Sequence, residues 1–299
     1  MHHLARRILP VAGALLVGLA TTATAAAAQF IAYGLTTNMQ GAQQIVRFNT
    51  NAPNMVTTVG GTGVTLTGID FRPATGQLFG YDGDRLYTVN LTTGAATQVF
   101  DVGNTPGNVG FDFNPTVDRI RLIGPNGTNF RLNPLDGSTT IDGAYTFAMG
   151  DVNFGRVPTF TAVAYTNSDT DVNTGTMLFG IDPTLGQLIR IASPNGGAIN
   201  TVGDLGIRGY TSLTGFDIIT VGGVNTAFFT ATFGNGATSR LYTVDLGTGT
   251  ATMVGEISAL NGVTGLALTA VPEPATWALM VSGLAGLGVV ARRRRRTQA

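Results

Sequence analysis

The feature that most constrains the fold is an internal repeat. The segment 68–74, Gly-Ile-Asp-Phe-Arg-Pro-Ala, recurs as Gly-Phe-Asp-Phe-Asn-Pro-Thr at 110–116, and a shorter copy occupies 215–218. A second element, Arg-Leu-Tyr-Thr-Val-Asn-Leu-Thr-Thr-Gly at 85–94, returns almost unchanged at 240–249. A unit length of roughly 40 to 50 residues is typical of propeller blades.

Each unit has the pattern of four short antiparallel strands. Looser copies of the second element lie at 45–50 and 177–183, and residues 162–165 begin a unit that lacks the aspartate. The third and fourth strands are joined by an Asn/Asp-x-x-x-Gly turn, in which glycine supplies the positive φ. No amphipathic helical stretch interrupts these runs, so the pattern predicts an all-β domain.

The two ends of the repeat array complement each other. The last copy, 262–268, has only a first strand, and the first copy, 30–60, lacks one. Pairing the two would complete a blade and remove exposed sheet edges. We therefore predict a five-bladed β-propeller of four-stranded blades, closed by its N- and C-terminal strands, with Leu266 and Leu268 fixed in the sheet. An open sandwich and a β-solenoid are the alternatives.

The chain starts with the features of an export signal. Arg6 and Arg7 precede an apolar run, 8–20, and a small-residue segment, 21–28, which suits cleavage before Gln29. We predict a signal peptide at residues 1–28 and a mature propeller domain at 29–270. A further segment, 271–299, is set apart by its composition.

This C-terminal segment has three parts. The prolines of 271–274 favour an extended chain. Residues 275–291 carry no charge, and as a transmembrane helix they would span about 25 Å. Arginines at 292–296 would then keep that end in the cytoplasm. The candidate sorting residues are Val271, Pro272, Glu273, Pro274, Arg292, Arg293 and Arg294.

The tail resembles the PEP-CTERM sorting signal of Gram-negative bacteria. The resemblance implies export across the inner membrane, anchoring there by the C-terminal helix, and recognition and cleavage near the Pro-Glu-Pro box by an exosortase. The expected partners are therefore the exosortase and the secretion machinery, and the final location is the cell envelope or the extracellular space. Such proteins are associated with exopolysaccharide and biofilm.

Composition excludes several kinds of chemistry. Between Gln29 and Ala270, ten arginines and sixteen acidic residues give a net charge near −6, which argues against nucleic acid and anionic membrane as partners. The chain has no Cys or Lys, and its histidines, His2 and His3, lie in the signal peptide. Ser-His-Asp, Cys-His, Schiff-base and His-ligated zinc chemistry are excluded from the domain. We assign no catalytic residue, and the sequence favours a non-enzymatic protein.

Three aspartates form one candidate site. Asp70, Asp112 and Asp217 occupy equivalent positions on first strands, which line the central channel of a propeller. Converging carboxylates could bind a cation or flank a sugar, as paired carboxylates do in glycoside hydrolysis. In the alternative, each caps a turn or pairs with an arginine. Their repetition favours this structural role, because a functional site is usually unique.

A second candidate is a calcium loop, the one cofactor site that the sequence offers. Asp169, Asp171 and Asn173 place oxygen ligands at alternate positions. The loop departs from the EF-hand pattern, since its glycine is one position late and Gly180 stands where a glutamate belongs. A solvated turn is the alternative. Apart from this calcium, no cofactor is expected.

A third candidate site is a group of arginines. Arg119, Arg121 and Arg131 could form a local patch for an acidic glycan, or they could make ion pairs between blades.

The repeat region also resembles a known family. Segments 110–121, 129–134, 150–153 and 164–167 are similar to the bacterial "domain of unknown function 4394" family. The resemblance implies an exported propeller-like domain that often carries this tail, and it brings no established activity or catalytic residues.

Our leading hypothesis is therefore an exported non-enzymatic propeller that binds a polysaccharide or another surface protein. The alternative is a carboxylate-based glycoside-active enzyme. That enzyme would need two unpaired carboxylates about 5 to 9 Å apart in one open pocket.

Overall fold

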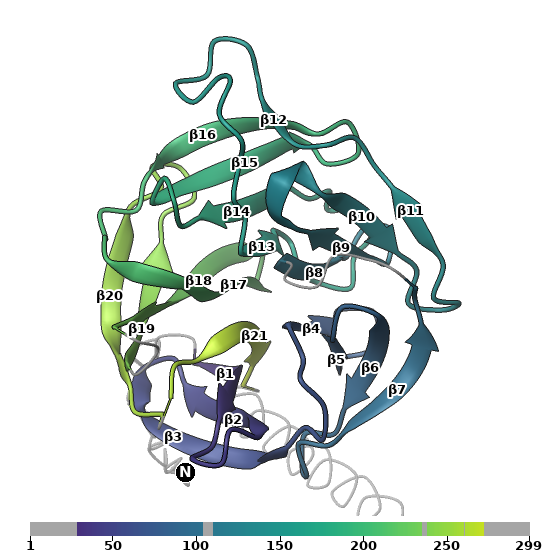
Figure 1. The fold of residues 1–299 in the computed structure, drawn as a ribbon, viewed down its shortest axis with the longest axis vertical. Helices are drawn as coiled ribbons and strands as arrows, with labels where there is room; N and C mark the ends of the chain where they lie inside the picture. The colour runs from purple at the N-terminus through teal and green to yellow at the C-terminus, as the bar shows by residue number, and fades with distance from the viewer. Residues whose placement is uncertain (1–28, 104–109, 235–237, 260, 272–299) are drawn as a thin grey trace, which may run out of the picture.

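The computed structural model of the chain describes residues 29–103, 110–234, 238–259 and 261–271. The predicted signal peptide, the segment 275–291 and the arginines at 292–296 lie outside these residues. Within them the chain forms five sheets that surround a central axis (Figure 1). The prediction of a five-bladed propeller with four-stranded blades is confirmed, and one blade gains a short extra strand.

Four blades follow one another along the chain. Blade 1 contains β4 (Gly68–Arg72), β5 (Gln77–Tyr81), β6 (Arg85–Val89) and β7 (Ala96–Asp101). Blade 2 contains β8 (Gly110–Asn114), β9 (Arg119–Ile123), β10 (Asn129–Leu132) and β11 (Thr139–Ile141), with a 3₁₀ turn, η1, at Pro125–Gly127. Blade 3 contains β13 (Ala162–Tyr165), β14 (Leu178–Asp182), β15 (Gln187–Ser193) and β16 (Ala198–Asp204), and β12 (Thr146–Phe147) adds to it in parallel with β16. Blade 4 contains β17 (Tyr210–Val221), β18 (Val224–Phe233), β19 (Thr238–Val244) and β20 (Ala251–Ile257).

Blade 5 joins the two ends of the domain. It contains β21 (Thr264–Ala270), β1 (Phe30–Thr37), β2 (Gln43–Asn49) and β3 (Ala52–Gly61). Strand β21 pairs with β1 in antiparallel register, with Ala32 opposite Leu268. Leu266 and Leu268 are 3% and 5% exposed, so the prediction that the last strand closes the ring is confirmed.

The turn between third and fourth strands forms as predicted. The Asn90 Oδ1 atom accepts hydrogen bonds from the backbone N–H groups of Thr92 and Thr93 at 2.8 and 3.0 Å. Gly94 follows with a φ of 76°. The side chain therefore replaces backbone partners inside the turn, and glycine accepts the left-handed conformation that closes it.

The core lies between neighbouring sheets, in five hydrophobic clusters of the described residues. Between blades 1 and 2, the rings of Phe79 and Phe113 meet edge to face at 5.4 Å. Such an aromatic pair contributes about 0.5–1.5 kcal/mol beyond its buried area. In the described part of the chain, no helix is both long and apolar enough to cross a bilayer.

Candidate functional site

The innermost strands of the five blades line the central channel. These are β4, β8, β13, β17 and β21, and each contacts its neighbours around the ring. Each has a small residue at the equivalent position, two residues before the site of the aspartate: Gly68, Gly110, Ala162, Gly215 or Gly265.

The glycines let adjacent strands approach closely. A Cβ added at Gly68 would lie 2.5 Å from the Cβ of Phe111, and one at Gly215 would lie 2.7 Å from the backbone nitrogen of Leu266. The cavity at this level measures only 20 Å³, room for about one water molecule. We refer to this narrow level as the glycine waist.

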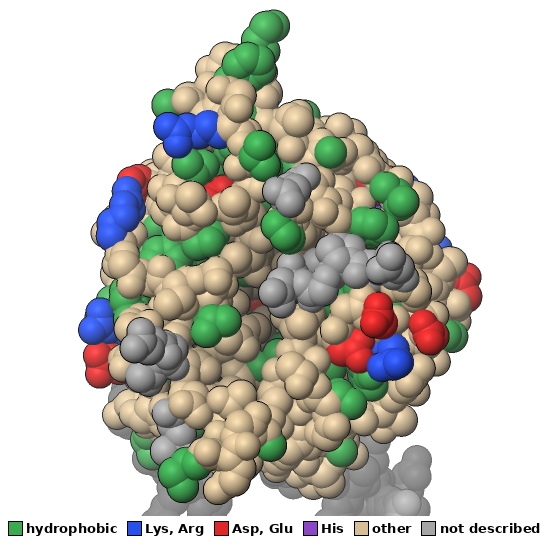
Figure 2. Space-filling view, in the orientation of Figure 1, with side chains coloured by type: hydrophobic (Ala, Val, Ile, Leu, Met, Phe, Trp, Pro, Cys, Tyr) green, Lys and Arg blue, Asp and Glu red, His purple; other side chains and the backbone are tan. Residues whose placement is uncertain are grey.

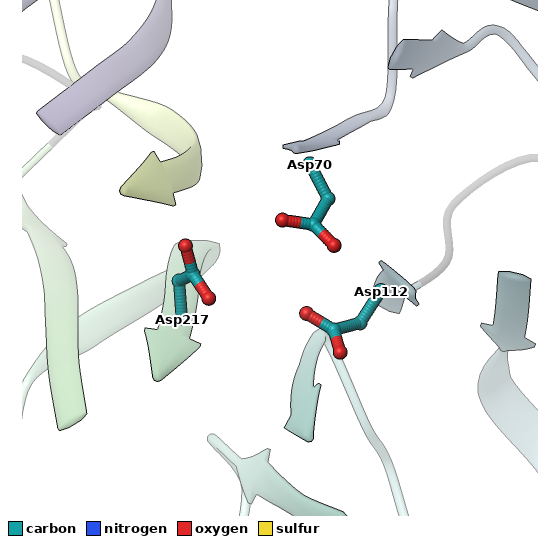
Figure 3. Close-up of side chains that lie close together, drawn as sticks. All are labelled: Asp70, Asp112 and Asp217. Atoms are coloured by element: carbon teal, nitrogen blue, oxygen red, sulfur yellow. The ribbon is translucent and has the colours of Figure 1, made fainter. Parts of the chain in front are cut away.

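The three candidate aspartates lie next to the waist. Asp70, Asp112 and Asp217 point toward one another from three innermost strands, and carboxylate oxygens of all three lie within 4.8 Å of one another (Figure 3). They are 4%, 4% and 5% exposed. The structure thus brings together the three aspartates that the sequence placed at equivalent positions of the first strands.

Each carboxylate accepts a hydrogen bond from a backbone N–H of the next blade. The donors are Phe113 for Asp70 at 2.8 Å, Tyr165 for Asp112 at 2.8 Å and Leu268 for Asp217 at 2.6 Å. The equivalent positions of the other two innermost strands hold Ala164 and Ala267. The aspartates thus connect consecutive blades. This role is structural, but it differs from the turn cap or arginine pair that the sequence suggested.

Burial also changes the ionisation of these aspartates. It raises the pKa of Asp217 to about 7. Burial first, and then the charge of Asp217, raise the pKa of Asp70 well above its usual range. Burial and the charges of Asp70 and Asp217 do the same for Asp112. At neutral pH the cluster consequently holds protons rather than three full negative charges.

This geometry differs from that of a glycosidase. Glycosidases hold their two carboxyl groups about 5 to 9 Å apart, with the sugar between them. Here the three carboxylates are closer together, buried and already hydrogen-bonded. A cavity of 170 Å³ borders Asp70 and Asp217 on the side away from the glycine waist, yet both remain almost fully buried.

A wider opening lies on the other side of the waist. This funnel has a volume of 480 Å³. Its polar lining includes Thr36, Thr65, Thr67, Ser212, Thr214 and Asn261. None of the described residues that line it is ionisable. The face seen in Figure 2 is hollowed at its centre, and most of its charged side chains lie away from the hollow.

Two amides hold the rim of the funnel in place. The Gln43 side chain donates to the carbonyl oxygen of Leu66 at 2.8 Å and accepts from the Leu66 N–H at 2.7 Å. Asn261 donates to the carbonyl oxygen of Thr37 at 2.7 Å.

Sequence reasoning missed the funnel. The available signal was a threonine directly before the small residue of four innermost strands: Thr67, Thr161, Thr214 and Thr264.

The loop of the calcium prediction is an exposed turn between β13 and β14. The Asp169 Oδ1 atom accepts from the N–H of Asp171 at 2.8 Å. The Asp171 Oδ1 atom accepts from the backbone and the side-chain amide of Asn173 at 2.9 and 3.0 Å. In this arrangement the carboxylates cap local turns, as the alternative expected, and calcium binding stays a prediction.

Ion pairs between blades were the alternative for Arg121 and Arg131, but both arginines pair within their own blade, and the ion pair between blades is made by Arg72. Arg72 of β4 makes an ion pair with Asp118, which precedes β9 of the next blade. Arg121 and Arg131 both pair with Asp142, which follows β11 of their own blade. Of the sorting residues, Val271 donates a backbone hydrogen bond to Gln29 at 3.2 Å. Pro272, Glu273, Pro274 and Arg292, Arg293 and Arg294 lie outside the described residues.

Fold and site together define a five-bladed β-propeller with a closed waist and an uncharged funnel. Residues 44–267 match the family described as "Domain of unknown function (DUF4394)". The chain belongs to this family. Residues 270–296 match the PEP-CTERM protein-sorting motif. The protein is therefore an exosortase-sorted surface protein, exported to the envelope or the extracellular space.

Solved structures resemble the chain only distantly. Hydrazine synthase of Kuenenia stuttgartiensis matches at 8% identity and a TM-score of 0.39, over 62% of this chain and 47% of its own. The chain thus spans about half the length of that protein. A chain of a nidogen/laminin complex matches at 10% identity and a TM-score of 0.47, over 80% and 98%. A protein from Lactobacillus plantarum matches at 10% identity and a TM-score of 0.41, over 81% and 100%. None of the curated proteins compared with the chain matches it.

Proposed function

We propose that the exported domain is a non-enzymatic binding protein of the cell surface that holds a polysaccharide in the funnel. The observation that carries this proposal is the division of the channel at the glycine waist. On one side, an open funnel of 480 Å³ presents hydroxyl and amide groups without a charged side chain. On the other, the buried carboxylates are already hydrogen-bonded to neighbouring blades.

The chemistry of the funnel suits a polyhydroxylated ligand. Threonine, serine and asparagine side chains donate and accept hydrogen bonds, as sugar hydroxyls do. The volume lies within the range of ligand pockets, about 300–1,000 Å³. A link to exopolysaccharide and biofilm would follow from such binding at the surface.

A glycan screen of the exported protein, with and without calcium, tests the proposal. We expect binding of at least one polysaccharide without release of reducing ends. Thr65→Val and Ser212→Ala should weaken that binding, whereas Thr57→Val, on the exposed side of β3, should leave it unchanged. Absence of binding to every glycan would refute the proposal and direct the search to a protein partner.

The same screen tests the glycosidase alternative and the calcium prediction. Release of reducing ends that is lost in Asp112→Asn would establish the enzyme and overturn the binding proposal. A calcium-dependent change that disappears in Asp169→Asn with Asp171→Asn would establish the metal site.

The processing step is tested separately. We propose that the segment 275–291 anchors the protein in the inner membrane until the exosortase cleaves near Pro272. In a host without the exosortase, the protein should have the mass of the uncleaved chain and remain in the membrane fraction. Unchanged mass and location between the two hosts would refute this step.

A further inference from the structure

A second pocket, separate from the funnel, is lined by arginines. In the described part of the chain, a cavity of 530 Å³ lies where blades 2 and 3 meet. Its polar lining includes Arg119, Arg121 and Arg131 of blade 2 with Asn114, Tyr165 and Asn195. No residue of this lining belongs to the funnel.

Two of these arginines are neighbours across strands. Arg121 of β9 and Arg131 of β10 are directly opposite each other in the register. Like charges in this position are unfavourable unless something compensates them. The compensating group is Asp142, which accepts from Arg121 at 2.6 Å and from Arg131 at 2.7 and 2.9 Å. Although burial acts in the opposite direction, these hydrogen bonds hold the pKa of Asp142 below its usual value.

The third arginine, Arg119, adds a positive charge, and its hydrogen bonds to the described residues go to backbone oxygens and not to a carboxylate. Arg119 donates to the backbone carbonyl oxygens of Val117 and Asp118 at 3.4 and 2.9 Å. The nearby Asp136 is exposed, and its carboxylate accepts from Ser138 and Asn133. Three guanidinium groups against the single carboxylate of Asp142 therefore leave the pocket positive, in a domain whose net charge is negative.

The guanidinium of Arg121 is held rigidly. It is buried, with 2% of its side chain exposed, and it donates to Asn129 at 2.6 Å and to Asn195 at 2.7 Å. Arg131 leaves 34% of its side chain exposed. Its Nε and one terminal nitrogen bind Asp142, so its other terminal nitrogen can donate to a ligand.

We propose that this pocket binds the carboxylate of an acidic saccharide, a uronate unit. A guanidinium matches a carboxylate in geometry and charge. The side-chain amides of Asn114 and Asn195, which also line the pocket, suit the sugar hydroxyls around that group.

A protein partner fits this lining less well. Protein interfaces obtain most of their affinity from aromatic and other large anchors in desolvated pockets. The aromatic residue of this pocket, Tyr165, is itself 2% exposed and belongs to the core.

Calorimetric titration of the exported protein with a galacturonate trimer tests the inference. We expect binding that weakens as salt increases. Arg119→Gln and Arg131→Gln should each weaken it by about 10-fold or more, the usual contribution of a charge-assisted hydrogen bond. Arg190→Gln removes the same charge from an exposed position outside the lining and should have no effect. The carboxyl-reduced trimer should bind at least 10-fold more weakly.

Two further arms identify the acidic group. A sulfated galactose trimer and inorganic phosphate should compete poorly with the uronate, and competition at equal strength would overturn the assignment to a carboxylate. Equal affinities in Arg131→Gln and Arg190→Gln, or no binding of the trimer at all, would overturn the site. Binding of neutral glycans in the funnel is measured independently, so this inference and the proposed function can fail separately.

Discussion

The carboxylate of Asp217 in β17 accepts a hydrogen bond of 2.6 Å from the backbone N–H of Leu268 in β21. Leu268 in turn lies opposite Ala32 in the pair of strands that closes the ring. One buried side chain therefore connects blade 4 to the closing strand. The burial that makes this bond possible also raises the pKa of Asp217 to about 7.

The first prediction concerns pH. Folded Asp217 keeps a proton that the unfolded chain loses near pH 4, so its contribution to stability is largest below that pH and falls as pH rises to about 7. Asp217→Asn keeps an oxygen acceptor but cannot ionise. We expect the free energy of unfolding of this variant, relative to that of the wild type, to rise by a few kcal/mol between pH 4 and pH 8. The rise is about 1.4 kcal/mol per pH unit, because one proton separates the folded and unfolded wild type. Urea unfolding at both pH values measures this, with the exposed Asp171→Asn as control. A difference independent of pH would contradict the prediction.

The second prediction separates the hydrogen bond of Asp112 from its charge. Asp112→Ala leaves the buried N–H of Tyr165 without this acceptor, whereas Asp112→Asn can keep it. We expect the alanine variant to be less stable than the asparagine variant by about 1–3 kcal/mol. Denaturant unfolding at pH 7 compares the two. Equal stabilities would show that the bond between blades contributes nothing measurable.

The third prediction concerns the glycine waist. An alanine at Gly68 would bring its Cβ within 2.5 Å of the Phe111 Cβ, so the two strands must move apart. We expect Gly68→Ala to lower the free energy of unfolding by about 1–3 kcal/mol or more. Gly61→Ala is the matched control, since the added Cβ would lie 3.9 Å from the Gln43 carbonyl oxygen, an ordinary van der Waals contact. A thermal midpoint that falls equally in both variants would contradict the explanation.

The fourth prediction concerns the junction of domain and tail. A chain that ends at Val271 retains all of β21 and the hydrogen bond to Gln29. We expect it to unfold at the same denaturant concentration as the domain with its tail. A chain that ends at Val263 lacks β21, so it should lose cooperative unfolding. If both truncated chains unfolded alike, ring closure by β21 would not be needed for stability.

Repetition in the sequence predicted much of this structure. Because the segment around Asp70 recurs around Asp112 and Asp217, the three aspartates could be assigned to equivalent positions in three blades. The incomplete units at the two ends of the array predicted the pairing of β21 with β1. These inferences succeed because each blade repeats the same local pattern of strands and turns.

Contacts between blades and between strands of one blade were harder to predict. The acceptor for the Tyr165 N–H is 53 residues away, in another blade. The sharing of Asp142 by Arg121 and Arg131 depends on strand register, which spacing alone does not give. Strand β12 has two residues, too few to show a period. The funnel was missed because the threonines that precede the small residues of four innermost strands come together only when the blades are arranged in a ring.

The pairing of β1 with β21 also affects how the domain folds. Thr36 donates to the carbonyl oxygen of Asn261, 225 residues further along the chain. Contacts of such high sequence separation slow folding, because loop-closure entropy must be overcome first. Since synthesis runs from the N-terminus, β1 is complete long before β21 exists. Until β21 pairs with it, that edge of β1 can pair with other chains, so an incomplete chain is more prone to aggregate than the closed ring.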